Sequence, residues 1–123
     1  MAHKILIADD EQNIVISLEY LMRREGFEVS IAQDGDEAIA RTRAELPDLV
    51  LLDIMMPKMN GFEVCQEIKS DPTLKAVRIL MLTAKGRDTE IAKGLALGAD
   101  GYITKPFSTK ELVERIRALL AAN

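Results

Sequence analysis

Cysteine and histidine are almost absent from this chain. Its 123 residues include one cysteine, Cys65, and one histidine, His3. A single cysteine excludes an internal disulfide and a cysteine-rich metal site. A lone free thiol is typical of a reducing compartment, so we expect a cytoplasmic protein.

Aromatic residues and long apolar segments are scarce as well. There is no tryptophan and only 4% of the residues are aromatic, which argues against a flavin carrier that holds its ring between aromatic side chains. The N-terminus enters a short apolar run at residues 5–7, far too short for a signal peptide or a transmembrane helix. We therefore expect no membrane partner.

The charges are mixed, without a basic excess. The chain has 16 lysine and arginine residues against 20 aspartate and glutamate residues, a net charge of -4. This balance disfavours direct binding to nucleic acid. With 48% hydrophobic residues the chain can bury a full core, and we expect one domain over residues 1–123.

Short apolar runs alternate with longer amphipathic segments along the whole chain. The runs that we expect to be strands cover residues 5–8, 27–31, 49–52, 79–82 and 102–103. Three of them are continuously apolar, as strands buried between two layers of helices are. Five strands and five helices in strict alternation predict an α/β fold, a doubly wound parallel sheet with helices on both faces.

Capping residues indicate where several helices begin and end. Asp34, Asn60 and Ser108 each stand three residues before a glutamate, as helix N-cap residues often do. Gly26 and Gly98 stand where two helices should end. These signals place helices between the expected strands.

Polar residues follow four of the expected strands. Asp9 and Asp10 come after the first strand, Asp53 after the third, Thr83 after the fourth and Lys105 after the fifth. In an open parallel sheet, ligands bind beyond the carboxyl ends of the strands. If these four strands are neighbours, three carboxylates, a hydroxyl and an ammonium group meet at one edge.

A divalent cation would stabilise this acidic edge. Three carboxylates within about 5 Å of one another repel by several kcal/mol. All the candidate ligands are oxygen atoms, so Mg²⁺ fits better than zinc, and it leaves positions for phosphate oxygens. The cluster therefore predicts phosphoryl transfer, with Asp53 as nucleophile, Asp9 and Asp10 at the metal, and Thr83 and Lys105 at the phosphoryl oxygens.

Four motifs resemble the response regulator receiver family. They are Asp9-Asp10, the segment LLDIMMPKMNG at residues 51–61, Thr83-Ala84 and the segment GADGYITKPF at residues 98–107. They occur in the family's order, each at an expected strand, and the similarity covers essentially the whole chain. The resemblance implies a flavodoxin-like sheet with strand order 2-1-3-4-5.

The resemblance also assigns roles to residues. It makes Asp53 the phosphorylation site, and it implies that Asp9, Asp10 and the backbone carbonyl of Met55 hold Mg²⁺. The phosphoryl donor would be a histidine kinase or a histidine phosphotransfer protein.

A conformational switch is implied in the same way. Thr83 and Lys105 would bind the phosphoryl group, and the peptide bond between Lys105 and Pro106 would be cis. Tyr102 resembles the aromatic switch residue that moves inward when the threonine is drawn towards the phosphate. Phosphorylation would thereby change the face formed by the fourth helix, fifth strand and fifth helix, which would bind a downstream protein.

Some positions depart from common family patterns. Two positions that tune the phosphate lifetime hold Met55 and Lys85, and neither side chain would position an attacking water well, so we predict slow self-dephosphorylation. Family members with a winged-helix DNA-binding domain usually carry acidic residues where this chain has Leu97 and Gly101. We therefore expect a monomer or a weak phosphorylation-dependent dimer, with the apolar Ile91 and Leu97 available to another partner.

Other functions fit the residues less well. A dehalogenase-type phosphatase needs a second carboxylate two residues after its nucleophile, where this chain has Met55. An inert interaction module would not need the complete acidic set. We expect a protein that is no enzyme on external substrates and catalyses only its own phosphorylation and dephosphorylation. It is either a stand-alone regulator or the receiver of a longer protein with a DNA-binding or enzymatic output domain.

Overall fold

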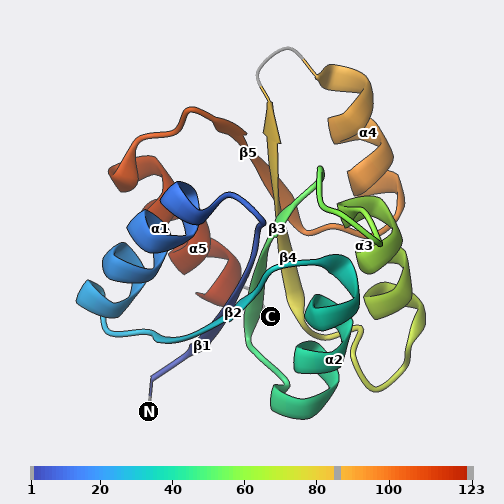
Figure 1. The fold of residues 1–123 in the computed structure, drawn as a ribbon, viewed down its shortest axis with the longest axis horizontal. Coiled ribbons are helices and arrows are strands. Elements are labelled where there is room, and N and C mark those ends of the chain that lie inside the picture. The colour runs from blue at the N-terminus through green and yellow to red at the C-terminus, as the bar shows by residue number, and fades with distance from the viewer. Residues whose placement is uncertain (1, 85–86, 122–123) are drawn as a thin grey trace.

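The computed structural model describes residues 2–84 and 87–121, and strands alternate with helices along it (Figure 1). The strands are β1 (Lys4–Ala8), β2 (Glu28–Ala32), β3 (Leu49–Asp53), β4 (Arg78–Ala84) and β5 (Gly101–Lys105). The helices are α1 (Gln12–Arg24), α2 (Gly35–Glu45), α3 (Gly61–Ser70), α4 (Asp88–Ala96) and α5 (Thr109–Ala121). None of these described helices has the length and apolar character needed to cross a membrane.

The five strands form one parallel sheet in the order β2-β1-β3-β4-β5, which confirms the predicted fold class and strand order. The three central strands, β1, β3 and β4, contain the three continuously apolar runs of the sequence. The register pairs Ala8 with Leu52 and Asp53 with Leu82. The carboxyl ends of β1, β3 and β4 therefore lie at one edge of the sheet.

Alternate residues of the central strands face opposite sides of the sheet. Ile5 and Ile7 of β1 pack in a core cluster with α1 and α5, whereas Leu6 and Ala8 pack in a second cluster with α2 and α3. Figure 1 shows α1 and α5 on one side of the sheet and α2, α3 and α4 on the other. The two apolar layers fix the strands whose ends carry the polar residues.

The predicted N-cap residues begin three of the helices. The side chains of Asp34, Asn60 and Ser108 each accept a hydrogen bond from the backbone N–H three residues later. Gly26 and Gly98 follow the ends of α1 and α4 with φ angles of 92° and 107°. This left-handed conformation is one that glycine adopts readily, so both helix ends were placed correctly.

The strand boundaries differ from the prediction by one or two residues. Asp53, Thr83 and Lys105 belong to β3, β4 and β5 and do not lie in the turns after them. Pairing of β4 with β5 continues past the apolar run, where Ala84 is opposite Lys105. In addition, β2 begins one residue later than predicted, because the N–H of Phe27 still bonds to the carbonyl of Met22 in α1.

Candidate functional site

Three carboxylates meet at the carboxyl edge of the sheet. One carboxylate oxygen each from Asp9, Asp10 and Asp53 lie within 4.8 Å of one another. Asp9 is fully buried and Asp53 is 5% exposed, while Asp10 is exposed. The N–H of Asp9 bonds to the carbonyl of Ala32 at 3.2 Å, and Oδ1 of Asp9 accepts the N–H of Glu11 at 2.9 Å. The structure thus brings the predicted acidic cluster together.

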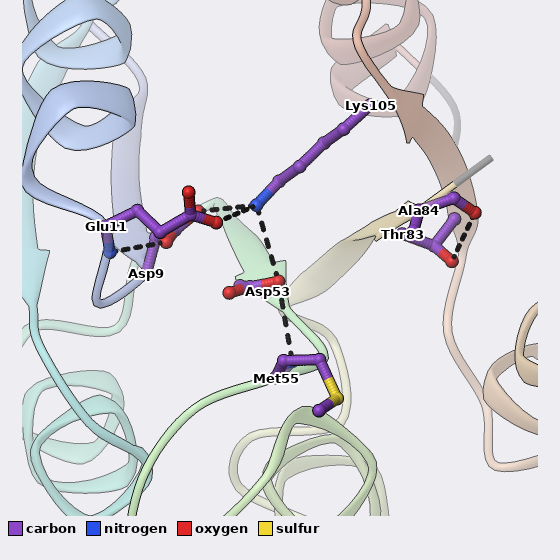
Figure 2. Close-up of polar contacts among 7 residues, drawn as sticks. All are labelled: Asp9, Glu11, Asp53, Met55, Thr83, Ala84 and Lys105. Atoms are coloured by element: carbon purple, nitrogen blue, oxygen red, sulfur yellow. Dashed lines mark hydrogen bonds and ion pairs between the residues drawn. The ribbon is translucent and has the colours of Figure 1, made fainter.

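Lys105 extends from β5 across this cluster (Figure 2). Its Nζ atom lies 3.2 Å from Oδ2 of Asp9, 3.2 Å from Oε1 of Glu11 and 3.5 Å from Oδ1 of Asp53. The side chain of Lys105 is 19% exposed, so these ion pairs are only partly screened by water. A single ammonium group therefore compensates several carboxylates.

The hydroxyl of Thr83 and the backbone of Met55 complete the surroundings of Asp53. Thr83 is 2% exposed, and its hydroxyl donates only a long 3.4 Å hydrogen bond to the carbonyl of Ala84. The N–H of Met55 donates to Oδ1 of Asp53 at 3.4 Å, while the Met55 side chain is largely exposed. Both residues line the same cavity as Asp53.

A small cavity joins most of these residues. Its volume is about 130 Å³, and Asp53, Met55, Thr83 and Lys105 all line it. The wall also contains three charged residues for which the sequence predicted no role: Glu11, Arg87 and Glu90. The sequence could have indicated Glu11, since it directly follows Asp9-Asp10. Nothing in the sequence indicated Arg87 and Glu90, because they reach the cavity only through the position of α4.

One predicted site residue, Tyr102, lies away from the cavity. Tyr102 is half-buried on β5 and does not line the cavity. Nη1 of Arg115 donates to the Tyr102 carbonyl at 2.8 Å, and the Arg115 guanidinium lies 5.6 Å from the centre of the Tyr102 ring. Lys85 lies outside the described residues. The peptide bond between Lys105 and Pro106 is cis.

Burial and charge shift the protonation of the two central groups. Burial, and after it the neighbouring charge of Asp9, raises the pKa of the Asp53 carboxyl to about 6, against the opposing effects of Lys105 and the Met55 N–H. Burial disfavours the charged form of Lys105, but the charges of Asp53 and Asp9 outweigh it, so the pKa of Lys105 is raised. Lys105 is therefore charged at neutral pH, and Asp53 is mostly ionised at pH 7.5.

The donor set fits Mg²⁺. Three carboxylates surround a common point, two of them buried, and a lysine already supplies positive charge there. Oxygen atoms are the ligands that Mg²⁺ prefers, and neither histidine nor cysteine lines the cavity. A nearly buried carboxylate, next to a cation, a hydroxyl and room for a small group, has the parts needed for phosphoryl transfer to a protein side chain.

Comparison with known proteins identifies the family. Residues 5–117 match the response regulator receiver domain. The chain is 46% identical over 120 residues to the alkaline phosphatase synthesis transcriptional regulatory protein PhoP of Bacillus subtilis (strain 168), which covers 98% of this chain and 49% of that protein. It is 44% identical over 120 residues to the phosphate regulon transcriptional regulatory protein PhoB of Rhizobium meliloti (strain 1021), covering 98% and 53%. The chain thus spans about half the length of these relatives.

A solved structure gives the same result for the fold. The chemotaxis response regulator CheY4 of Vibrio cholerae superposes on this chain with a TM-score of 0.91 at 31% identity, covering 97% of this chain and 99% of that one. The family match runs from β1 into α5 and includes every residue of the site described above. The chain therefore belongs to the response regulator receiver domain family of two-component signalling, whose members interact with histidine kinases and downstream targets.

Proposed function

We propose that Asp53 accepts a phosphoryl group in a Mg²⁺-dependent reaction and that the chain acts as a phosphorylation-controlled switch. The observation that carries this proposal is the environment of Asp53. Its side chain is almost buried at the end of β3. One of its carboxylate oxygens lies within 4.8 Å of an oxygen of Asp9 and an oxygen of Asp10, and Nζ of Lys105 is 3.5 Å from its Oδ1. Several charged groups around one nearly buried carboxylate are costly for folding, and such clusters are typical of functional sites.

The reaction transfers a phosphoryl group from a histidine kinase or a histidine phosphotransfer protein. A carboxylate oxygen of Asp53 forms a bond to phosphorus while the bond between phosphorus and the donor imidazole nitrogen breaks. The imidazole takes the electron pair and then a proton from water. The hydroxyl of Thr83 and the ammonium group of Lys105, which line the same cavity, donate hydrogen bonds to the phosphoryl oxygens.

The carboxylates of Asp9, Asp10 and Asp53, together with the backbone carbonyl of Met55, would hold Mg²⁺. The bound ion would neutralise negative charge on the oxygens of the phosphoryl group. The protein's own contribution is to fix these carboxylates on rigid strand ends, with Asp9 fully buried.

The size of the cavity supports a switch over an enzyme that acts on external substrates. Small-molecule sites typically have volumes of about 300–1,000 Å³. The cavity at Asp53 has about 130 Å³, which suits a phosphoryl group better than a whole substrate. The position two residues after Asp53 is Met55, so the second carboxylate of a dehalogenase-type phosphatase is missing. We therefore propose that the chain catalyses only its own phosphorylation and dephosphorylation.

The conformational change on phosphorylation would reach the surface formed by α4, β5 and α5, where a protein partner would bind. Thr83 is on β4 beside β5, where it pairs with Thr104, and Tyr102 is two residues earlier on β5. A phosphoryl group that draws Thr83 inward would favour one arrangement of Tyr102 and bias the binding of a protein partner. PhoP and PhoB are transcriptional regulatory proteins, which supports an output in transcription for a longer protein that contains this chain.

Intact mass after incubation with acetyl phosphate tests the central step. We expect a gain of one phosphoryl group that requires both MgCl₂ and Asp53, and that is lost in Asp53→Asn. Asp36→Asn changes an exposed carboxylate in the first turn of α2 and should leave the gain intact. A gain that survives Asp53→Asn, or no gain with any donor, would contradict the proposal.

A further inference from the structure

The loop between β3 and α3, residues 54–60, presses against the start of α2. A Cβ atom built on Gly35 would overlap the carbonyl oxygen and the Cβ of Met59, and it would lie 2.7 Å from the Met59 carbonyl carbon. Real Cβ atoms do not approach backbone this closely, so any side chain at Gly35 requires a shift. The loop backbone therefore uses the space that a side chain would fill.

A charged pair ties the same two segments together. Nζ of Lys58, in the loop, lies 3.6 Å from Oδ2 of Asp34, the N-cap residue of α2. Oδ1 of Asp34 meanwhile accepts the N–H of Glu37 at 2.9 Å, which fixes the carboxylate on the helix. The outer end of the loop thus contacts α2 through both backbone and side chains.

The other end of the loop packs against β3, the strand that carries Asp53. The N–H of Gly61 donates to the carbonyl of Ile54 at 2.9 Å, and a Cβ atom on Gly61 would lie 2.5 Å from the carbonyl oxygen of Asp53. Within the loop, the N–H of Met55 donates to Oδ1 of Asp53 at 3.4 Å. Met59 is therefore joined to Met55 and Asp53 through a short loop whose two ends are held together by the hydrogen bond from Gly61 to Ile54.

If a side chain appeared at Gly35, the loop would move more easily than the helix. Helix α2 buries Ala38, Ile39 and Thr42, and the first two belong to a core cluster. The loop, by contrast, exposes four of its seven residues: Met55, Pro57, Lys58 and Asn60. Packed cores resist displacement, whereas exposed segments yield at lower cost.

We propose that Gly35 is a positioning residue for the site at Asp53, because it lets the start of α2 hold the β3–α3 loop in the arrangement that binds Mg²⁺ and accepts the phosphoryl group. This inference rests on the proposed function. Gly35→Ala should raise the Kd for Mg²⁺ by about tenfold, the lower end of what loss of an outer support of a metal site causes. Phosphorylation at a fixed subsaturating MgCl₂ concentration should slow in proportion.

The test uses the full chain and a matched glycine. Gly94 also lies within a helix, but a Cβ atom there would come no closer than 3.5 Å to the Met81 side chain, an ordinary contact. Gly94→Ala therefore controls for the general effect of replacing helical glycine by alanine. Lys58→Met removes the ion pair to α2 without crowding the loop, and we expect it to raise the Kd about twofold to threefold.

Mg²⁺ affinity is measured by titrating MgCl₂ and following the backbone amide NMR signals of Asp53 and Met55. Acetyl phosphate and intact mass give the phosphorylation rate, and urea unfolding without Mg²⁺ gives stability. We expect Gly35→Ala to raise the Kd and slow phosphorylation while Gly94→Ala matches the wild type. If Gly35→Ala lowers stability but keeps the wild-type Kd, its role is structural only and the inference is wrong.

Three further outcomes are decisive. If Gly35→Ala does not fold, Lys58→Met decides, and an unchanged Kd in that variant overturns the inference. A wild-type chain that neither binds Mg²⁺ nor gains a phosphoryl group overturns the proposed function and this inference with it. If the wild type and Gly35→Ala bind Mg²⁺ and accept the phosphoryl group equally well, this inference is wrong but the proposed function stands.

Discussion

Nζ of Lys105 lies 3.5 Å from Oδ1 of Asp53, so a cation on β5 faces the carboxylate at the end of β3 (Figure 2). The same ammonium group is 3.2 Å from the fully buried Asp9. Lys105 is thus a cation that compensates these acidic groups in the part of the chain that the structure describes. When Mg²⁺ binds the same carboxylates, it must compete with this ammonium group.

Replacing Lys105 by methionine should change metal binding and phosphorylation in opposite directions. The variant keeps much of the side chain's bulk but loses the competing charge, so Mg²⁺ should bind more tightly. It also loses a donor to the phosphoryl oxygens, so phosphorylation by acetyl phosphate at saturating Mg²⁺ should slow by roughly 100-fold. Amide NMR titration and intact mass measure the two effects. Weaker Mg²⁺ binding in Lys105→Met would contradict this account.

Asp53→Asn should stabilise the protein without Mg²⁺, in a manner that depends on pH. The pKa of Asp53 is about 6 in the folded protein, above its ordinary value of 3.8, so ionising it costs folding free energy. That cost is absent below about pH 4, grows between pH 4 and 6, and is complete above pH 6. Asp53→Asn should therefore raise the free energy of unfolding by about 1–3 kcal/mol at pH 7.5 and much less at pH 4.5.

Urea unfolding at the two pH values measures this difference. Asp36→Asn, which changes an exposed carboxylate, should show little gain at either pH. An equal gain for Asp53→Asn at both pH values would mean that its charge is not the cause.

Phosphorylated protein should lose its phosphoryl group slowly. The Met55 side chain is 70% exposed beside the cavity and has no carboxylate or amide to orient a water molecule. We expect the phosphoryl group to persist well beyond seconds in buffer, and Met55→Asn to shorten its lifetime. Intact mass at intervals after removal of the donor gives both lifetimes. Loss within seconds in the wild type would disprove the prediction.

A second ion pair, far from the site, should matter for stability alone. Nζ of Lys69 in α3 lies 2.9 Å from Oδ2 of Asp100, and the same oxygen accepts the N–H of Ile79 at 2.8 Å. Lys69 also donates to the carbonyls of Lys75 and Val77. Asp100→Ala leaves a lysine that is 14% exposed without its carboxylate, so we expect a loss of about 2 kcal/mol or more.

The exposed pairs of Arg43 with Glu67 and Asp71 provide the control for this prediction. Arg43→Ala should cost less than about 1 kcal/mol in urea unfolding. Asp100→Ala should retain phosphorylation at Asp53. Equal losses of stability in the two variants would show that burial does not strengthen the Lys69 pair.

The acidic cluster was predictable because parallel strands end at a common edge. Asp9 and Asp53 each directly follow an apolar run, and the structure places both at that edge. The contact of Lys105 with Glu11 was not predictable, because it depends on the conformation of two long side chains. Arg87 reaches the cavity only because α4 begins there, and no local pattern indicates this.

The fold was predictable to a similar extent. Continuous apolar runs at residues 5–8, 49–52 and 79–82 marked the three central strands, because burial on both faces demands apolar residues throughout. Their order came from the family resemblance, since burial does not distinguish one central position from another. The close contact between Gly35 and Met59 could not be foreseen, because it depends on how α2 packs against the loop.

Chemical trapping of the phosphorylated residue tests directly whether Asp53 accepts the phosphoryl group. The chain is treated with acetyl phosphate and MgCl₂, reduced with borohydride, which converts an aspartyl phosphate to homoserine, and mapped by peptide mass spectrometry. We predict homoserine at position 53 alone, and none when MgCl₂ is omitted. Homoserine at Asp9, Asp10 or any other carboxylate in place of Asp53, or at no position, would show that Asp53 is not the phosphoacceptor.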